Sequence, residues 1–178
     1  MQSGTEIAVR DAQTDERDAV RRITLAAYAQ YATIMAPSAW AGLRDALATA
    51  LTNDHGAQRI VADRDGGIVG SVLLFPPSTD AYGDIAAAAP WPEVRLLAVA
   101  PEARGLGVGK LLIDECIRRA RAMGMDAIGL HTSPSMRDAI RLYESFGFTR
   151  EPDLDIHVDG AEPIQAYRLS LSASQPHA

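Results

Sequence analysis

The chain has 178 residues, of which 47% are hydrophobic and 22% charged, a balance typical of a soluble globular protein. Its formal net charge of -6 disfavours general nucleic-acid binding, which needs a basic surface, and favours a cationic partner such as an amine only weakly. The single cysteine, Cys116, excludes an internal disulfide framework, and we interpret it as a buried, inert thiol.

No apolar run approaches the roughly 18 residues that a membrane-spanning helix needs. Residues 1–6 lack the basic and apolar regions of a signal peptide. We therefore expect a cytoplasmic protein with no membrane partner. Since no repeat or linker is visible, residues 1–178 are expected to form one domain, with a core at about 7–171 and a frayed tail at 172–178. The histidines show no metal-ligand spacing, and no metal is expected.

The N-terminal half is predicted to begin with a strand at residues 6–10 and to continue with two helices. Thr14 and Ser38 are expected to be the N-caps of these helices. Apolar residues recur at helical spacing: Val20, Ile23, Ala27 and Tyr31 in the first helix, and Trp40, Leu43, Leu47 and Leu51 in the second. Strands at 59–63 and 68–75 are then predicted to pair as a hairpin around Asp65-Gly66-Gly67.

The C-terminal half alternates strands with helices. Residues 76–92 are interpreted either as a substrate loop or as a slack connection. The elements expected after them are strands at 94–99, 126–131, 148–150 and 164–171, and helices at 107–123 and 135–146. This order describes an α/β fold in which helices cover a mixed sheet.

The most informative stretch is Arg104-Gly105-Leu106-Gly107-Val108-Gly109, which lies between a predicted strand and a predicted helix. Glycines before a helix N-terminus expose backbone N–H groups, and the helix dipole adds positive potential, so a phosphate-bearing ligand is expected here. A Walker loop is excluded because Lys110 is followed by leucine. A dinucleotide fingerprint is excluded because the third glycine comes one residue too soon.

Two motifs at this spacing resemble those of the GNAT family of N-acetyltransferases. Residues 104–109 fit its R/Q-x-x-G-x-G/A signature, and residues 96–101 resemble its central strand. Residues 139–148, Ala-Ile-Arg-Leu-Tyr-Glu-Ser-Phe-Gly-Phe, match its A-x-x-L-Y-x-x-x-G-F segment. The resemblance covers about residues 7–171, with motif-specific matches only in 93–148. It implies a single-domain, mostly antiparallel sheet flanked by helices, the GNAT-like acyl-CoA N-acyltransferase fold.

The resemblance also implies a binding site for acetyl-CoA as co-substrate. Its pyrophosphate would bind the backbone N–H groups of the glycine loop, formed by Arg104, Gly105, Gly107, Val108, Gly109 and Lys110. The Leu97 N–H would polarise the thioester carbonyl, and the Val99 backbone would pair with the pantetheine arm. Many family members have an asparagine at the position of Met136, and Ser133 or Ser135 is a candidate replacement for that coenzyme contact.

Glu93 stands where family members often carry the general base, which an alkylamine of pKa ~10 requires at neutral pH. Period-2 alternation predicts that Glu93, Arg95, Leu97 and Val99 share one face of the strand. Because Glu93 and Leu97 are about 13 Å apart along a strand, the proton is expected to leave through water. A solvated carboxylate is the other interpretation of Glu93, and His131 is the alternative base.

Tyr143 is the tyrosine of the A-x-x-L-Y segment, where the family has a general acid or a sulfur contact. A phenol can protonate the leaving thiolate if the site is arranged for it. The other interpretation is an ordinary packed tyrosine beside Leu142 and Phe146. Tyr28, Tyr31, Met35 and Trp40 are interpreted in the same two ways, as a wall of the acceptor site or as helix packing.

The leading hypothesis is an acetyl-CoA-dependent N-acetyltransferase in which a primary amine attacks the thioester directly within a ternary complex. A non-catalytic acyl-CoA-binding module is the second hypothesis, and transfer of a longer acyl chain or transfer to a hydroxyl is the third. The acceptor, a small-molecule or peptide amine, is not named by the sequence. A homodimer is common in the family, and no stretch of the chain demonstrates one.

Overall fold

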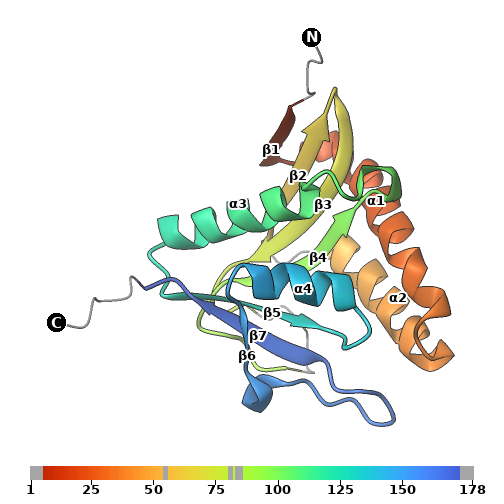
Figure 1. Ribbon diagram of the computed structural model, residues 1–178, viewed down its shortest axis with the longest axis vertical. Coiled ribbons are helices and arrows are strands. Elements are labelled where there is room, and N and C mark those ends of the chain that lie inside the picture. The colour runs from red at the N-terminus through yellow and green to blue at the C-terminus, as the bar shows by residue number, and fades with distance from the viewer. Residues whose placement is uncertain (1–5, 54–55, 80–81, 83–85, 173–178) are drawn as a thin grey trace.

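A computed structural model describes residues 6–53, 56–79, 82 and 86–172. Within them, seven strands form one sheet in the order β1-β2-β3-β4-β5-β7-β6, and only the β4–β5 pair is parallel (Figure 1). The expected mostly antiparallel sheet flanked by helices is therefore confirmed. No helix of the described part is both long and apolar enough to cross a membrane.

The elements follow one another in the expected order. The first half holds β1 (Ile7–Asp11), α1 (Arg17–Tyr28), α2 (Pro37–Thr52), β2 (Gln58–Arg64) and β3 (Gly67–Phe75). The second half holds β4 (Glu93–Val99), α3 (Val108–Ala122), β5 (Ala127–Thr132), α4 (Arg137–Ser145), β6 (Thr149–Arg150) and β7 (Gln165–Ser170). The frayed tail expected at 172–178 lies almost wholly outside the described residues, which end at Ser172.

Both predicted helix caps are wrong. Gln13, not Thr14, precedes the first helical turn, and its N–H donates to the Glu16 carboxylate at 2.6 Å, as in a capping box. The second helix starts at Pro37, whose fixed φ suits the first helical position and whose missing N–H leaves no orphan donor. Ser38 therefore lies inside α2 and is not its cap.

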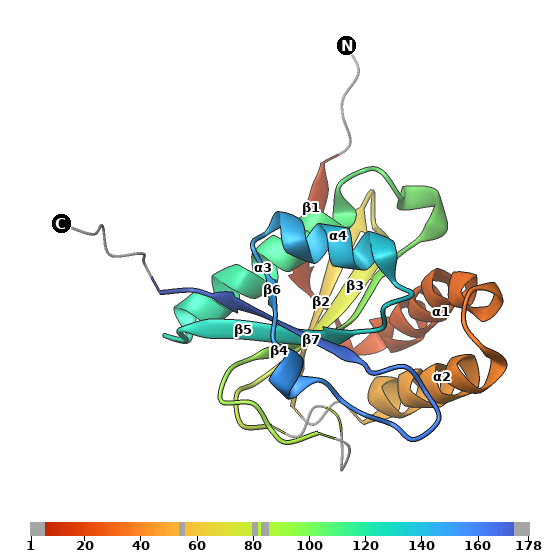
Figure 2. The same cartoon turned by 60° about the horizontal axis from the view of Figure 1, so that its bottom comes forward.

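Helices cover both faces of the sheet (Figure 2). On one face α3 buries Leu112, Ile113 and Cys116 completely against the central strands. On the other face, α1 and α2 bury Val20 and Leu47 against β3 and β4. The sheet is thus buried on both sides, which explains why β2, β3 and β5 read as nearly continuous apolar runs.

Strand β4 is irregular at its centre. The β3–β4 register shifts between Ser71 and Leu73, and Leu96 has φ 53°, a left-handed conformation rare for a branched apolar residue. After this bulge, each side chain points to the face of the sheet opposite to the one that regular alternation would give it. Arg95 packs on the Phe75 ring beneath α1 and α2, whereas Leu97 and Val99 pack against the core beneath α3.

The bulge overturns the expectation that Glu93, Arg95, Leu97 and Val99 share one face, because strict alternation does not survive an inserted residue. Strands β4 and β5 pair only at Glu93 with Gly129 and at Val94 with Leu130, and they diverge beyond those positions (Figure 1). The sheet is therefore open between β4 and β5 alongside the C-terminal part of β4, which contains Leu97 and Val99.

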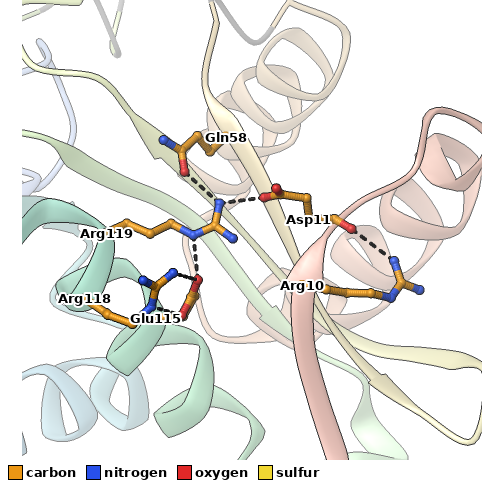
Figure 3. Close-up of polar contacts among 6 residues, drawn as sticks. All are labelled: Arg10, Asp11, Gln58, Glu115, Arg118 and Arg119. Carbon is orange, nitrogen blue, oxygen red and sulfur yellow. Dashed lines mark hydrogen bonds and ion pairs between the residues drawn. The ribbon is translucent and has the colours of Figure 1, made fainter. Parts of the chain in front are cut away.

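Arg119 ties α3 to the edge of the sheet (Figure 3). Its guanidinium donates to Asp11 of β1 at 2.6 Å, to Gln58 of β2 at 2.7 Å and to Glu115 of its own helix at 2.7 Å. Arg118 pairs with the same Glu115 but points into solvent. Hydrogen bonds from Arg118 and Arg119 lower the pKa of Glu115 to about 2, so their stabilisation is present above its ordinary 4.5 and is lost as pH falls toward 2.

We predict that Arg119→Ala lowers the free energy of unfolding by about 1–3 kcal/mol, because it removes three partners at a largely buried guanidinium. Arg118→Ala is the matched control and should cost less than about 0.5 kcal/mol, since that side chain is 66% exposed. Urea unfolding of both variants measures the difference. Equal losses in the two variants would contradict a bracing role for Arg119.

Candidate active site

The glycine loop ends in an open helix N-terminus. Gly107 has φ 79° and is the N-cap of α3, and Gly105 has the same φ, a region that glycine enters without a Cβ clash. The first backbone bond of the helix runs from the Leu111 N–H to the Gly107 carbonyl at 3.1 Å. The N–H groups of residues 108–110 precede it and are therefore left for an external acceptor.

Glycines also allow α3 to begin close against the sheet. A Cβ on Gly70 of β3 would lie 2.6 Å from Val108 Cγ1, so the first turn of α3 touches the strand backbone. A Cβ on Gly109 would lie 3.1 Å from Leu142 Cδ2 of α4 and 3.7 Å from Val99 Cγ2 of β4. The open N–H groups are therefore held at the place where β4, α3 and α4 meet.

The glycine loop carries positive charge and is anchored to α1. Arg104 and Lys110 are both exposed, and Arg104 donates to the Ala27 carbonyl near the end of α1 at 3.2 Å. The two cations and the positive end of the α3 dipole give this loop a local potential that favours an anion, although the chain as a whole is acidic.

Tyr143 of α4 is buried in the core that α3 covers, in the same cluster as Leu97 and Val99. Its ring packs on Phe148 at a centroid distance of 6.0 Å, and the residue is 7% exposed. Burial, with a smaller contribution from Tyr28, raises the pKa of Tyr143 well above its ordinary value of 10.0. The phenol is therefore a proton donor, and not an anion, at neutral pH.

Glu93 and His131 meet inside the sheet, which the sequence did not predict. Glu93 starts β4, His131 lies near the end of β5, and Glu93 Oε2 is 3.6 Å from His131 Nδ1. Both side chains are nearly inaccessible, at 6% and 9% exposure. The structure thus brings together the two residues that were alternatives for the base, and it excludes a solvated carboxylate at Glu93.

The segment before β4 fixes the Glu93 carboxylate. Trp91 Nε1 donates to Glu93 Oε1 at 3.2 Å, and the indole stacks beneath the Arg168 guanidinium at 5.4 Å. Gly129 of β5 makes room for both residues, because a Cβ there would lie 2.4 Å from Trp91 Nε1 and 2.9 Å from Glu93 Oε1. Sequence reasoning missed Trp91, whose only signal is its position between two prolines just before the strand.

Tyr82 packs against His131 and covers it. Its hydroxyl accepts a hydrogen bond from the His131 backbone N–H at 3.2 Å, and its ring meets the His131 ring edge-on at 4.6 Å. The Arg95 guanidinium also stacks on the Tyr82 ring, at 4.4 Å from its centroid. Residues 76–92 therefore contribute both Tyr82 and Trp91 to this site, although 80–81 and 83–85 lie outside the described residues.

A cleft of about 580 Å³ lies at the N-terminal end of α4. It is lined by Tyr31 from the α1–α2 connection, Asp138 from α4 and Glu162 from the segment before β7, among others. Burial raises the pKa of Tyr31, with Asp138 adding to the shift and Arg104 opposing it. Tyr31 thus faces the first turns of α4 across this cleft.

The remaining residues singled out by the sequence lie in or against the hydrophobic core. Cys116 is fully buried, as expected, and burial raises its pKa to about 12, which disfavours the reactive thiolate. Met136 is buried at the start of α4, where its sulfur accepts a hydrogen bond from the Thr132 hydroxyl. Tyr28 is buried between the helices and the sheet, and Tyr31, Met35 and Trp40 pack against the same core cluster. Across the described residues, no three acidic, His or Cys side chains gather as metal ligands.

The chain matches one protein family over most of its length. The model of the acetyltransferase (GNAT) family matches residues 18–148. An uncharacterized N-acetyltransferase of Schizosaccharomyces pombe is 35% identical over 99 residues, which are 55% of this chain and 55% of that protein. A mycothiol acetyltransferase of Thermomonospora curvata is 38% identical over 90 residues, 51% of this chain and 27% of that protein. The matches thus span about half or less of these relatives.

Solved structures of low sequence identity share the fold. A GNAT acetyltransferase from Staphylococcus aureus Mu50 aligns with a TM-score of 0.69 at 19% identity, covering 94% of this chain and 100% of that one. A GNAT acetyltransferase from Brucella melitensis, solved in complex with acetyl-CoA, aligns with a TM-score of 0.62 at 18% identity, covering 97% and 92% of the two chains. These alignments confirm the expected fold.

We predict that Gly129→Ala lowers the free energy of unfolding by about 1–3 kcal/mol, because the new methyl group would collide with Trp91 and Glu93. Gly42→Ala in α2 is the matched control. It meets no atom within 4 Å and should raise the stability by about 0.5–1 kcal/mol, since alanine favours the helix. Urea unfolding compares the two, and a neutral Gly129→Ala would contradict the close packing of Trp91 on β5.

Proposed function

This chain belongs to the acetyltransferase (GNAT) family, and we propose that it transfers the acetyl group of acetyl-CoA to a primary amine by direct attack in a ternary complex. The observation that carries the proposal is the position of the open α3 N-terminus beside the divergence of β4 from β5. One ligand can bind its phosphates at the first feature and extend into the second.

The residues present fit acetyl-CoA. The N–H groups of residues 108–110 and the exposed Arg104 and Lys110 suit a pyrophosphate, because they combine oriented donors with positive charge. Leu97 and Val99 follow the bulge and pack on the face of the sheet that α3 covers. Their backbone therefore borders the opening that would receive the pantetheine arm. When bound, acetyl-CoA supplies the thioester whose C–S bond breaks as the amine nitrogen forms the new C–N bond.

The chain's own groups serve the three needs of this reaction. The Leu97 N–H, at the bulge, donates to the carbonyl oxygen on which negative charge develops. Tyr143, kept protonated by burial, donates its phenolic proton to the departing sulfur. Glu93, reached through water, accepts the proton that the attacking amine must lose.

The comparisons support acetyl transfer more strongly than they support any acceptor. The mycothiol acetyltransferase is matched over 27% of its length, so its acceptor is not carried over to this chain. We propose a primary amine of a small molecule or a peptide, entering beside the cleft at Tyr31 and Asp138.

An assay of CoA release from acetyl-CoA across a panel of amines tests the proposal, with longer acyl-CoA donors as a comparison. Release that requires both protein and amine, and that is fastest with the acetyl donor, would support it. Binding of acetyl-CoA without release for any amine would favour a non-catalytic acyl-CoA-binding module.

We predict that Tyr143→Phe lowers turnover in this assay by about 10²-fold or more, because it removes the proton donor but keeps the ring. The Kd for acetyl-CoA should change by less than about tenfold, since at most one neutral hydrogen bond is lost. Tyr167→Phe on β7 is the matched control, because Tyr167 is similarly buried, at 5% exposure, but stacks on Arg150. Unchanged turnover in Tyr143→Phe would remove Tyr143 from the mechanism.

A further inference from the structure

The Glu93–His131 contact poses a problem of proton placement. His131 Nε2 lies 3.0 Å from the Leu154 carbonyl oxygen, and a carbonyl can only accept a hydrogen bond. Nε2 therefore carries a hydrogen. In a neutral imidazole the second nitrogen, Nδ1, then has only a lone pair, and this is the atom that faces Glu93.

An ionised Glu93 would place a second acceptor against this lone pair. Carboxylate oxygens donate nothing when ionised. Among the described residues, Glu93 Oε2 and His131 Nδ1 are the buried side-chain polar atoms that have no hydrogen-bond partner. Two acceptors facing each other at 3.6 Å, away from water, repel and stay unsatisfied.

Rotating the imidazole by 180° does not remove the conflict. The flipped ring would place carbon atoms against both Glu93 and Leu154 and would lose the Nε2 hydrogen bond. A single added proton, on either Oε2 or Nδ1, makes one atom a donor to the other, and the pair can then close from 3.6 Å to hydrogen-bond distance and satisfy both atoms. The pair then has no net charge, which suits its burial.

We propose that Glu93 and His131 hold one proton between them and act as a coupled dyad in place of a lone carboxylate. The neighbours hold each partner in position. Trp91 binds the other oxygen of the carboxylate, and the Tyr82 hydroxyl binds the His131 backbone. Among the described residues, the charged and titratable groups around the dyad are Tyr82, Arg95, which stacks on the Tyr82 ring, and Arg168, which stacks on Trp91.

The dyad changes the proton transfer at the active site, a consequence that rests on the proposed function. The form holding the shared proton cannot accept another from the amine without placing a net positive charge in the buried site. The proton-free form, with an ionised carboxylate and a neutral ring, is therefore the base. It takes the proton of the attacking amine through water and so returns to the one-proton form, which releases that proton before the next turnover.

Nuclear magnetic resonance of the ligand-free, full-length protein tests the shared proton without any turnover. With ¹⁵N-labelled histidine at neutral pH, we expect a downfield proton signal from the Glu93–His131 contact and a His131 Nδ1 shift that departs from that of a free lone pair. Both features should vanish in Glu93→Gln, while His157→Asn, at an exposed histidine, should leave them unchanged. If His131 Nδ1 in the wild type shows the shift of a free lone pair and no such proton signal is found, the dyad is wrong.

The pH profile of kcat/KM tests the catalytic role. Because Glu93 loses its partner, His131→Asn should lower kcat/KM and change its pH profile, and His157→Asn should change neither. An unmoved profile in folded His131→Asn would show that His131 is not part of the base. The outcomes of the two experiments separate the two proposals. The proton signal without acetyl transfer would support the dyad and overturn the proposed function. Acetyl transfer without the proton signal would support the proposed function and overturn the dyad.

Discussion

The divergence of β4 from β5 is the constraint on which the rest of the structure depends. The parallel pairing of β4 with β5 ends at Val94 and Leu130. Two residues later, the bulge at Leu96 reverses which face each side chain of β4 points to. A non-glycine residue with such a positive φ costs about 1–3 kcal/mol of backbone strain. Well-packed helices on both faces hold this strained strand in place. The opening between the strands thus belongs to the folded backbone.

The site has opposite electrostatic ends. At one end, the positive α3 N-terminus and Arg104 lie in solvent, where they suit a phosphate. At the other end, Glu93 and His131 are enclosed by aromatic rings and by stacked arginines, where they suit a proton that must be held and released. Tyr143 is buried with Leu97 in the core beside the opening, so that in the proposed reaction the proton acceptor and the proton donor come from different elements.

The sequence predicted the features that depend on local pattern. The glycine loop was placed correctly before a helix, the Leu142-Tyr143 segment was placed on a helix, and the hairpin at Asp65-Gly66-Gly67 was found, because each needs only neighbouring residues. The bulge at Leu96 was missed because no local signal marks a leucine with positive φ. The meeting of Glu93 with His131 was missed because it depends on the pairing register of two strands far apart in the sequence.

The most direct test of the account is calorimetric titration of the purified protein with acetyl-CoA. The account predicts micromolar binding, with an enthalpy that weakens when phosphate groups are removed from the ligand, because the N–H groups at the start of α3 are the proposed phosphate site. The absence of binding at millimolar acetyl-CoA would contradict it. The glycine loop would then be a structural turn between strand and helix, and the proposed acetyl transfer would fall with it.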